Sequence, residues 1–81
     1  MTIDFESERN WYIDCENEHR NDPEGYDFDK MFDDRIKNNP PDYLTKLVEI
    51  LKEKIHQERN VDEKFLLGRF YLAAIFMGNT L

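Results

Sequence analysis

The sequence has few cysteine, histidine, glycine and proline residues, and these shortages limit what the chain can be. Its 81 residues include one cysteine, Cys15, so no disulfide can form within the chain. Chains without disulfides are typical of reducing compartments, and the acidic N-terminus MTIDFESE lacks the apolar segment of a signal peptide. We therefore expect a cytoplasmic protein. The longest apolar run, residues 70–77, is far shorter than the roughly 20 residues that span a bilayer, so we expect no membrane span.

The length of the chain limits the size of its core. A chain of 81 residues is enough for one small domain. A domain of this size buries only about 60% of its unfolded surface, and such domains usually gain stability from a disulfide, a metal or a partner chain. Because a disulfide is excluded, we expect self-association or an obligate complex.

Basic residues are scarce in the first half of the chain. Residues 1–34 contain twelve acidic and three basic side chains, whereas residues 35–81 contain six acidic and eight basic ones, within an overall charge of −7. A surface with this surplus repels the phosphates of nucleic acids and anionic lipids, and it attracts basic surfaces. We therefore expect a protein partner with a basic surface, and no direct binding of nucleic acid.

The few helix-breaking residues divide the chain into four segments. Breakers cluster at residues 22–25 and 38–41 and recur weakly near Asn60. Between Leu44 and Ile55 the apolar residues recur every three or four positions, which predicts an amphipathic helix. The predicted fold class is all-α, a single domain with a small bundle of three to four helices that dimerisation would complete. The expected helices are about residues 4–19, 27–37, 40–58 and 61–77.

Capping residues indicate where the later helices begin and end. Asn39 suits the start of the third helix, since a proline in the first turn follows it. Asn60 with Glu63 three residues later resembles a capping box at the start of the fourth. Gly78 suits the C-terminal cap of that helix.

The fourth segment is apolar nearly all round. From Phe65 to Met77, only Gly68 and Arg69 interrupt the apolar residues. A helix with this pattern is central in a bundle or shared with another chain, and Gly68 is a candidate for the close approach of another helix. The residues expected to mediate self-association are Phe70, Ile75 and Phe76.

The stretch NDPEGYDFDKMFDD, residues 21–34, has six acidic side chains around a glycine, which raises the question of a calcium site. With Gly25 in the sixth place of an EF-hand loop, Arg20 occupies the first place and Met31 the twelfth, where oxygen ligands are required. The residue chemistry instead predicts a turn, followed by a helix that Asp27 caps.

Cys15 and His19 are four residues apart and share a helical face, so they suggest a zinc site or a thiol–imidazole pair. Zinc requires further ligands, and only His56 and carboxylates remain. The sequence contains no phosphate-binding glycine pattern and no GxSxG, HExxH or CxxC motif. We expect no enzymatic activity, no metal and no cofactor. An enzyme or metalloprotein that uses these residues is the third alternative.

Trp11 and Tyr12 are neighbours, so on a helix they diverge and cannot both face one core. Tyr12 belongs to the core-facing stripe, which leaves Trp11 either as an interface anchor or as a cover over the edge of a thin core. The residues expected to contact a partner are Trp11 and acids on the first two helices and their connection: Asp14, Glu18, Glu24, Asp27, Asp29, Asp33 and Asp34.

These observations predict a small acidic inhibitor or regulator that occludes a basic surface of another macromolecule. Mimicry of a nucleic-acid backbone is a specific version of this hypothesis. In size and charge such a chain is comparable with immunity proteins, antitoxins, phage-encoded inhibitors and assembly chaperones, and this comparison extends no further. The alternative is a structural or assembly subunit that binds through its apolar C-terminal helix.

Overall fold

Four α-helices follow one another in the computed structural model, which describes residues 2–80 and the side chains of residues 2–78. They are α1 (Phe5–Asn21), α2 (Phe28–Lys37), α3 (Tyr43–Gln57) and α4 (Val61–Thr80). The prediction of an all-α bundle is confirmed. Within the described residues, no helix is long and apolar enough to cross a membrane.

Short polar side chains begin three of the helices. The carboxylate of Asp4 accepts hydrogen bonds from the backbone N–H and the hydroxyl of Ser7. Asp27 accepts from the N–H of Lys30 at 3.0 Å, which confirms its predicted role as the cap of α2. At α4, the side chain of Asn60 accepts from the N–H of Glu63 at 3.0 Å. Each bond from a backbone N–H satisfies a donor that the first turn of a helix leaves unpaired.

The start of α3 differs from the prediction. The helix begins at Tyr43, and the N–H of Tyr43 donates to the carbonyl oxygen of Pro40 at 2.9 Å in a preceding turn. Asn39 is not the cap, because Asp42 is the residue before the helix; the side-chain amide of Asn39 donates to the carbonyl oxygen of Arg35 at 2.7 Å. The reason is the second proline: Pro41 disfavours the helical conformation for the residue before it.

The end of α4 also differs, because the helix continues to Thr80 and not to residue 77. Gly78 lies inside the helix and does not have a positive φ. A Cβ atom at Gly78 would come within 3.1 Å of Cδ2 of Leu44, so the glycine accommodates a tight contact between α4 and α3. Its role is therefore packing, and it is not the predicted cap.

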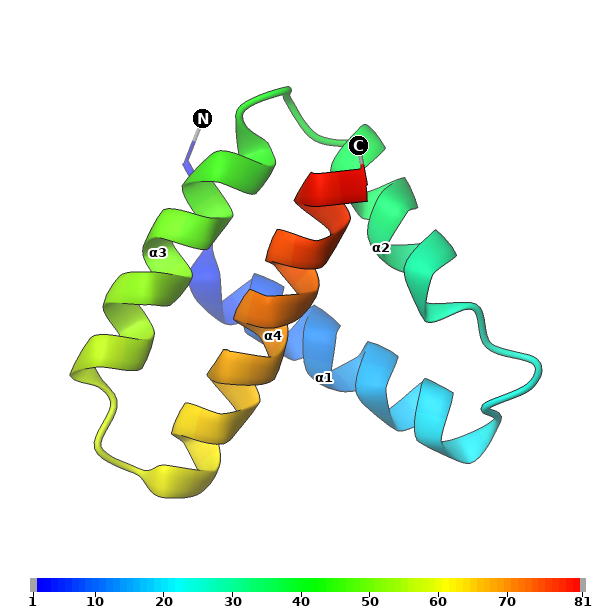
Figure 1. Ribbon diagram of the computed structural model, residues 1–81, viewed down its shortest axis with the longest axis horizontal. Helices are drawn as coiled ribbons and strands as arrows, with labels where there is room; N and C mark the ends of the chain where they lie inside the picture. The colour runs from blue at the N-terminus through cyan, green and yellow to red at the C-terminus, as the bar shows by residue number, and fades with distance from the viewer. Residues whose placement is uncertain (1, 81) are drawn as a thin grey trace.

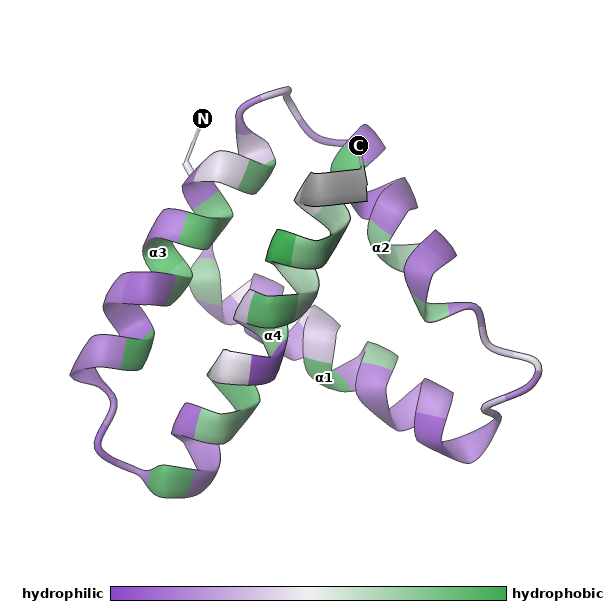
Figure 2. Cartoon of the chain, viewed as in Figure 1, coloured by the Kyte–Doolittle hydropathy of each residue, from purple (hydrophilic) through white to green (hydrophobic). Residues whose placement is uncertain are grey.

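The helices α3 and α4 form an antiparallel hairpin, and α1 crosses behind α4 (Figure 1). Side chains from all four helices meet in one core. Purple segments dominate α2 and the outer side of α3, whereas green residues occur on several sides of α4 (Figure 2). The fully buried core of the hairpin consists of Tyr43, Leu47, Leu51, Leu67, Phe70 and Ala74.

Phe70 is the centre of an aromatic cluster that joins the hairpin to α1 and α2. Its ring stacks on that of Tyr12 with centroids 4.5 Å apart and an interplanar angle of 5°. Phe32 of α2 meets the same ring edge-on at 6.1 Å. Aromatic pairs of these geometries contribute about 0.5–1.5 kcal/mol beyond the area they bury. The cluster therefore sets the position of α1 and α2 against the hairpin.

Candidate functional site

Some acidic side chains form ion pairs between helices, and Glu8 is the most buried of them. Only 6% of Glu8 is exposed, although the neighbouring acid Glu6 is exposed. Its carboxylate accepts hydrogen bonds from Nε of Arg35 at 2.9 Å and from the hydroxyl of Tyr43 at 2.6 Å. The three residues come from α1, α2 and α3, so one buried ionic group connects three helices.

The surroundings of this group act on its titration. Burial, and then the hydrogen bond to Glu8, raise the pKa of Tyr43 well above its usual range. Burial opposes the charge of Arg35, but the adjacent Glu8 outweighs it and raises the guanidinium pKa. Arg35 thus stays charged and Tyr43 stays protonated at neutral pH, which keeps both donors available to the carboxylate.

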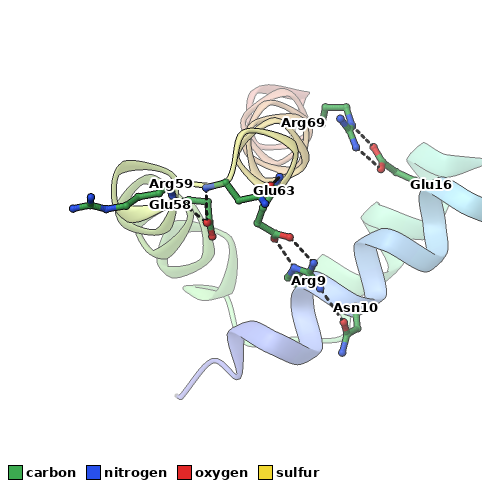
Figure 3. Close-up of polar contacts among 8 residues, drawn as sticks. Arg9, Asn10, Glu16, Glu58, Arg59, Glu63 and Arg69 are labelled. Carbon is green, nitrogen blue, oxygen red and sulfur yellow. Dashed lines mark hydrogen bonds and ion pairs between the residues drawn. The ribbon is translucent and has the colours of Figure 1, made fainter.

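Two further acids are used in pairs that connect α1 to α4 (Figure 3). Arg9 donates to both carboxylate oxygens of Glu63, at 2.6 and 2.5 Å. Arg69 donates in the same two-pronged way to Glu16, at 2.8 and 3.1 Å. Two-pronged arginine–carboxylate pairs fix geometry as well as charge, so these contacts orient α1 across α4.

We predict that the two α1–α4 pairs make the fold sensitive to acid. The hydrogen bond from Arg9 lowers the pKa of Glu63. Burial opposes the charge of Glu16, but hydrogen bonds from Arg69 and Tyr12 outweigh it and lower that pKa too. A carboxyl with a lowered folded-state pKa stabilises the fold above its unfolded pKa of about 4.3, and the contribution disappears as the pH falls through the folded value.

Urea titrations at pH 6.5 and 3.5 measure this effect. We expect a lower free energy of unfolding at pH 3.5, and a smaller decrease in the Glu16→Gln/Glu63→Gln variant. An equal decrease in both proteins would show that the pairs do not contribute.

The acidic connection between α1 and α2 is a turn, as predicted. The carboxylate of Asp22 accepts from the N–H of Gly25 at 3.1 Å. A Cβ atom at Gly25 would lie 2.2 Å from Oδ2 of Asp22, so a side chain at this position would displace the carboxylate. Among the described residues, no three His, Cys, Asp or Glu side chains are placed to hold a metal ion.

A second group of acids is exposed to solvent. These residues lie on α1, α2 and the loop between them; all are exposed, and in the described part of the chain none forms an ion pair. We refer to them as the acidic surface, and they are Asp14, Glu18, Glu24, Asp29 and Asp34.

The acidic surface extends over more than one side of the α1–α2 end of the molecule. Glu18 follows Trp11 by seven residues, about two helical turns, so the two residues lie on the same side of α1. Trp11 contacts Phe32 of α2 from that side. Asp29 instead lines a hollow with Arg69 of α4. Asp34 lies on a different side of α2 from Asp29, because five residues separate them.

Two of the predicted contact acids have structural roles. Asp33 is half-buried and pairs with Lys37 one turn later, with Oδ2 and Nζ 2.8 Å apart. Asp27 is the cap of α2. Both carboxylates therefore stabilise α2 and are less available to a partner than the acidic surface is.

Trp11 covers the edge of the core. It is half-buried, and its ring meets that of Phe32 edge-on at 5.2 Å. The guanidinium of Arg35, a residue of α2, lies 4.7 Å from the centroid of the Trp11 ring. This position corresponds to the second of the two interpretations of Trp11, and it leaves only part of the indole for contact with another molecule.

Cys15 and His19 do not come together as a reactive pair. Cys15 is buried, and burial raises the pKa of its thiol, which disfavours the thiolate. His19 is exposed, and its ring packs edge-on against Phe28 at 6.1 Å. The side chain near the thiol is that of Tyr26. Burial and the contact with Cys15 raise the pKa of Tyr26 to about 12.

A groove of about 880 Å³ lies between α1 and the α3–α4 hairpin. Its apolar floor includes Ile13 and Leu66, and four basic and four acidic side chains line it. Since Arg9 and Arg69 are already paired with acids of the same groove, the groove offers no surplus of one charge. It is therefore a weaker candidate for a charged ligand than the acidic surface.

The residues expected to mediate self-association are in different environments. Phe70 is fully buried in the core, so its side chain contributes nothing to the monomer surface. Ile75 is half-buried, and 58% of Phe76 is exposed. The prediction for Phe70 is corrected by its position: an all-round apolar helix does not reveal which side it buries.

The sequence matches no protein-family model, and no curated protein or solved structure is significantly similar to it.

Proposed function

We propose that the chain is a non-enzymatic binding protein whose acidic surface occludes a basic surface of another macromolecule. The observation that supports this is the division among its acids. Glu8, Glu16 and Glu63 each form an ion pair with an arginine of another helix. The acids of the acidic surface are exposed and have no ion pair in the described part of the chain. Folding therefore leaves the excess negative charge concentrated at the α1–α2 end.

Concentrated charge acts mainly on the rate of encounter. Exposed charges of one sign attract an oppositely charged partner over several ångströms and raise the association rate. The residence time then depends on apolar contacts near the charge. Met31, of which 40% is exposed, and the exposed part of Trp11 are available for this.

A partner that handles nucleic acid is a specific version of this proposal. Such partners carry basic surfaces shaped for phosphates, and carboxylates on two helices supply negative charge in their place. Direct binding of nucleic acid is disfavoured by repulsion. We propose that the chain acts in the cytoplasm, because its single cysteine cannot form an internal disulfide.

A second candidate is an assembly role for α4. Phe65 and Leu72 are 64% and 66% exposed on a helix of a small domain. Exposed apolar groups of this size often mark a contact with another chain. An assembly contact of this kind would persist at high salt, whereas a contact of the acidic surface would not.

A pull-down with two matched variants tests the proposal. Asp14 and Glu18 are exposed acids one turn apart on α1, and Glu49 and Glu53 are an equivalent exposed pair on α3. Asp14→Lys/Glu18→Lys and Glu49→Lys/Glu53→Lys change the net charge equally. The tagged wild-type chain and both variants are incubated with host-cell lysate and eluted with a salt gradient.

We expect the wild type to capture a basic protein that elutes by about 0.5 M salt, where screening shortens the reach of charges to a few ångströms. The α1 variant is expected to retain at least about tenfold less of it. The α3 variant is expected to retain nearly the wild-type amount. Equal retention by both variants would exclude the acidic surface as the binding site.

A further inference from the structure

One side of α4 carries a row of exposed apolar side chains. The exposed fractions of Val61, Phe65, Leu72 and Phe76 are 63%, 64%, 66% and 58%. Their spacing of four to seven residues places them on one side of the helix, with Gly68 in the middle. The opposite side of α4 is buried in the core. We call the exposed side the α4 stripe.

The α4 stripe is large for the surface of a monomer. Its four side chains expose roughly 450 Å², on the basis of about 150–250 Å² for a large side chain. The largest apolar patch of a typical monomer is about 300–600 Å², and one partner in a standard interface buries about 800 Å². The stripe alone thus supplies about half the area that a stable dimer needs, before its flanking residues are included.

The order of residues in the stripe is nearly symmetric about Gly68. Phe65 precedes Gly68 by three residues and Leu72 follows it by four. Val61 and Phe76 are seven residues before it and eight after. A two-fold axis beside Gly68 places an antiparallel second copy of α4 so that Phe65 meets Leu72 of the second copy. The same axis brings Val61 to Phe76 of the second copy, as an isologous interface requires.

Gly68 supports the same arrangement independently. A Cβ atom at this position would meet no atom within 4 Å, so packing inside the chain does not require glycine. Glycine in the middle of a helix destabilises it relative to alanine. At the crossing point of two helices, however, the missing side chain lets the backbones approach closely. The second copy gives this glycine a role that the monomer does not.

Charge also favours a second copy at this surface over other contacts between copies. The acids are concentrated in residues 1–34, and like-charged α1–α2 ends repel one another. The stripe holds no charged residue; at its borders Arg69 is paired with Glu16 and Lys64 is exposed. We propose that the α4 stripe is the interface of an antiparallel two-fold dimer centred on Gly68, whether or not the acidic surface binds a partner.

Sedimentation equilibrium of the full chain tests the dimer. We expect wild type to form a dimer of the 9.8 kDa chain at micromolar concentration. Leu72→Glu is expected to raise the dissociation constant at least 100-fold, because it places a carboxylate opposite Phe65 of the second copy. The control, Met31→Glu, alters the exposed apolar residue of α2 and should change the constant less than threefold. A monomeric wild type, or equal effects of the two variants, would overturn the proposal.

Crosslinking tests the antiparallel register. In a Cys15→Ala background, Phe65→Cys and Leu72→Cys chains are oxidised separately and as a mixture. The proposed register brings these two positions together across the interface, so a disulfide-linked dimer is expected only in the mixture. Crosslinking of either variant alone to the same extent would indicate a parallel arrangement and overturn the register. Circular dichroism of each variant verifies that it is folded.

Discussion

Phe70→Ala is expected to lower the free energy of unfolding by about 3–5 kcal/mol, as removal of a buried phenylalanine does. Phe70 is fully buried, stacks on Tyr12 and meets Phe32 edge-on. A chain of 81 residues has a total stability of roughly 4–12 kcal/mol. The variant should therefore lose between about a quarter of that stability and all of it. Urea denaturation followed by far-ultraviolet circular dichroism measures the change.

The control for this prediction is Met31→Ala. Met31 is a large apolar residue of α2 with 40% of its surface exposed. Its truncation should cost less than about 1 kcal/mol, because exposed sites lose little on mutation. If Phe70→Ala were as stable as Met31→Ala, the aromatic cluster would not be what holds α1 and α2 against the hairpin.

Glu8→Gln is expected to lower the free energy of unfolding by about 3 kcal/mol, the lower end of the range for breaking a buried ion pair. The variant leaves the guanidinium of Arg35 without its carboxylate, and the 27% exposure of that side chain moderates the cost. Tyr43→Phe removes only the neutral donor to Glu8 and should cost about 1 kcal/mol.

Glu6→Gln is the matched control, since Glu6 is an exposed acid two residues earlier on the same helix. It should change the free energy of unfolding by no more than about 0.5 kcal/mol. Similar urea midpoints for the Glu6 and Glu8 variants would contradict the structural role assigned to the buried carboxylate.

The helices could be predicted from the sequence because their signals are local. Apolar spacing located α3, and the carboxylate of Asp27 located the start of α2. Of the two errors, one has a local cause and the other arises from a contact between helices. Consecutive prolines delayed α3 to Tyr43, and Gly78 packs inside α4 where a cap was expected. In both cases the residue type is compatible with two structures, and a neighbouring residue, in sequence or in space, determines which one forms.

The candidate site was harder to predict because it depends on contacts between helices. Glu6 and Glu8 are the same residue type two positions apart. They differ because Arg35 and Tyr43, from two other helices, donate hydrogen bonds to Glu8. Phe70 and Phe76 are likewise equivalent in an all-round apolar segment, yet one is fully buried and the other is 58% exposed. The charge surplus of residues 1–34 was visible in the sequence, but the division between paired and exposed acids was not.

The association rate of the captured partner, measured against ionic strength, tests the central claim most directly. Rates are recorded from about 0.05 to 0.5 M salt, over which the Debye length shortens roughly threefold. We predict that the wild-type and Glu49→Lys/Glu53→Lys rates fall at least about tenfold over this range. The Asp14→Lys/Glu18→Lys rate should start lower and change much less. A wild-type rate independent of salt, or identical profiles for the two variants, would contradict the account.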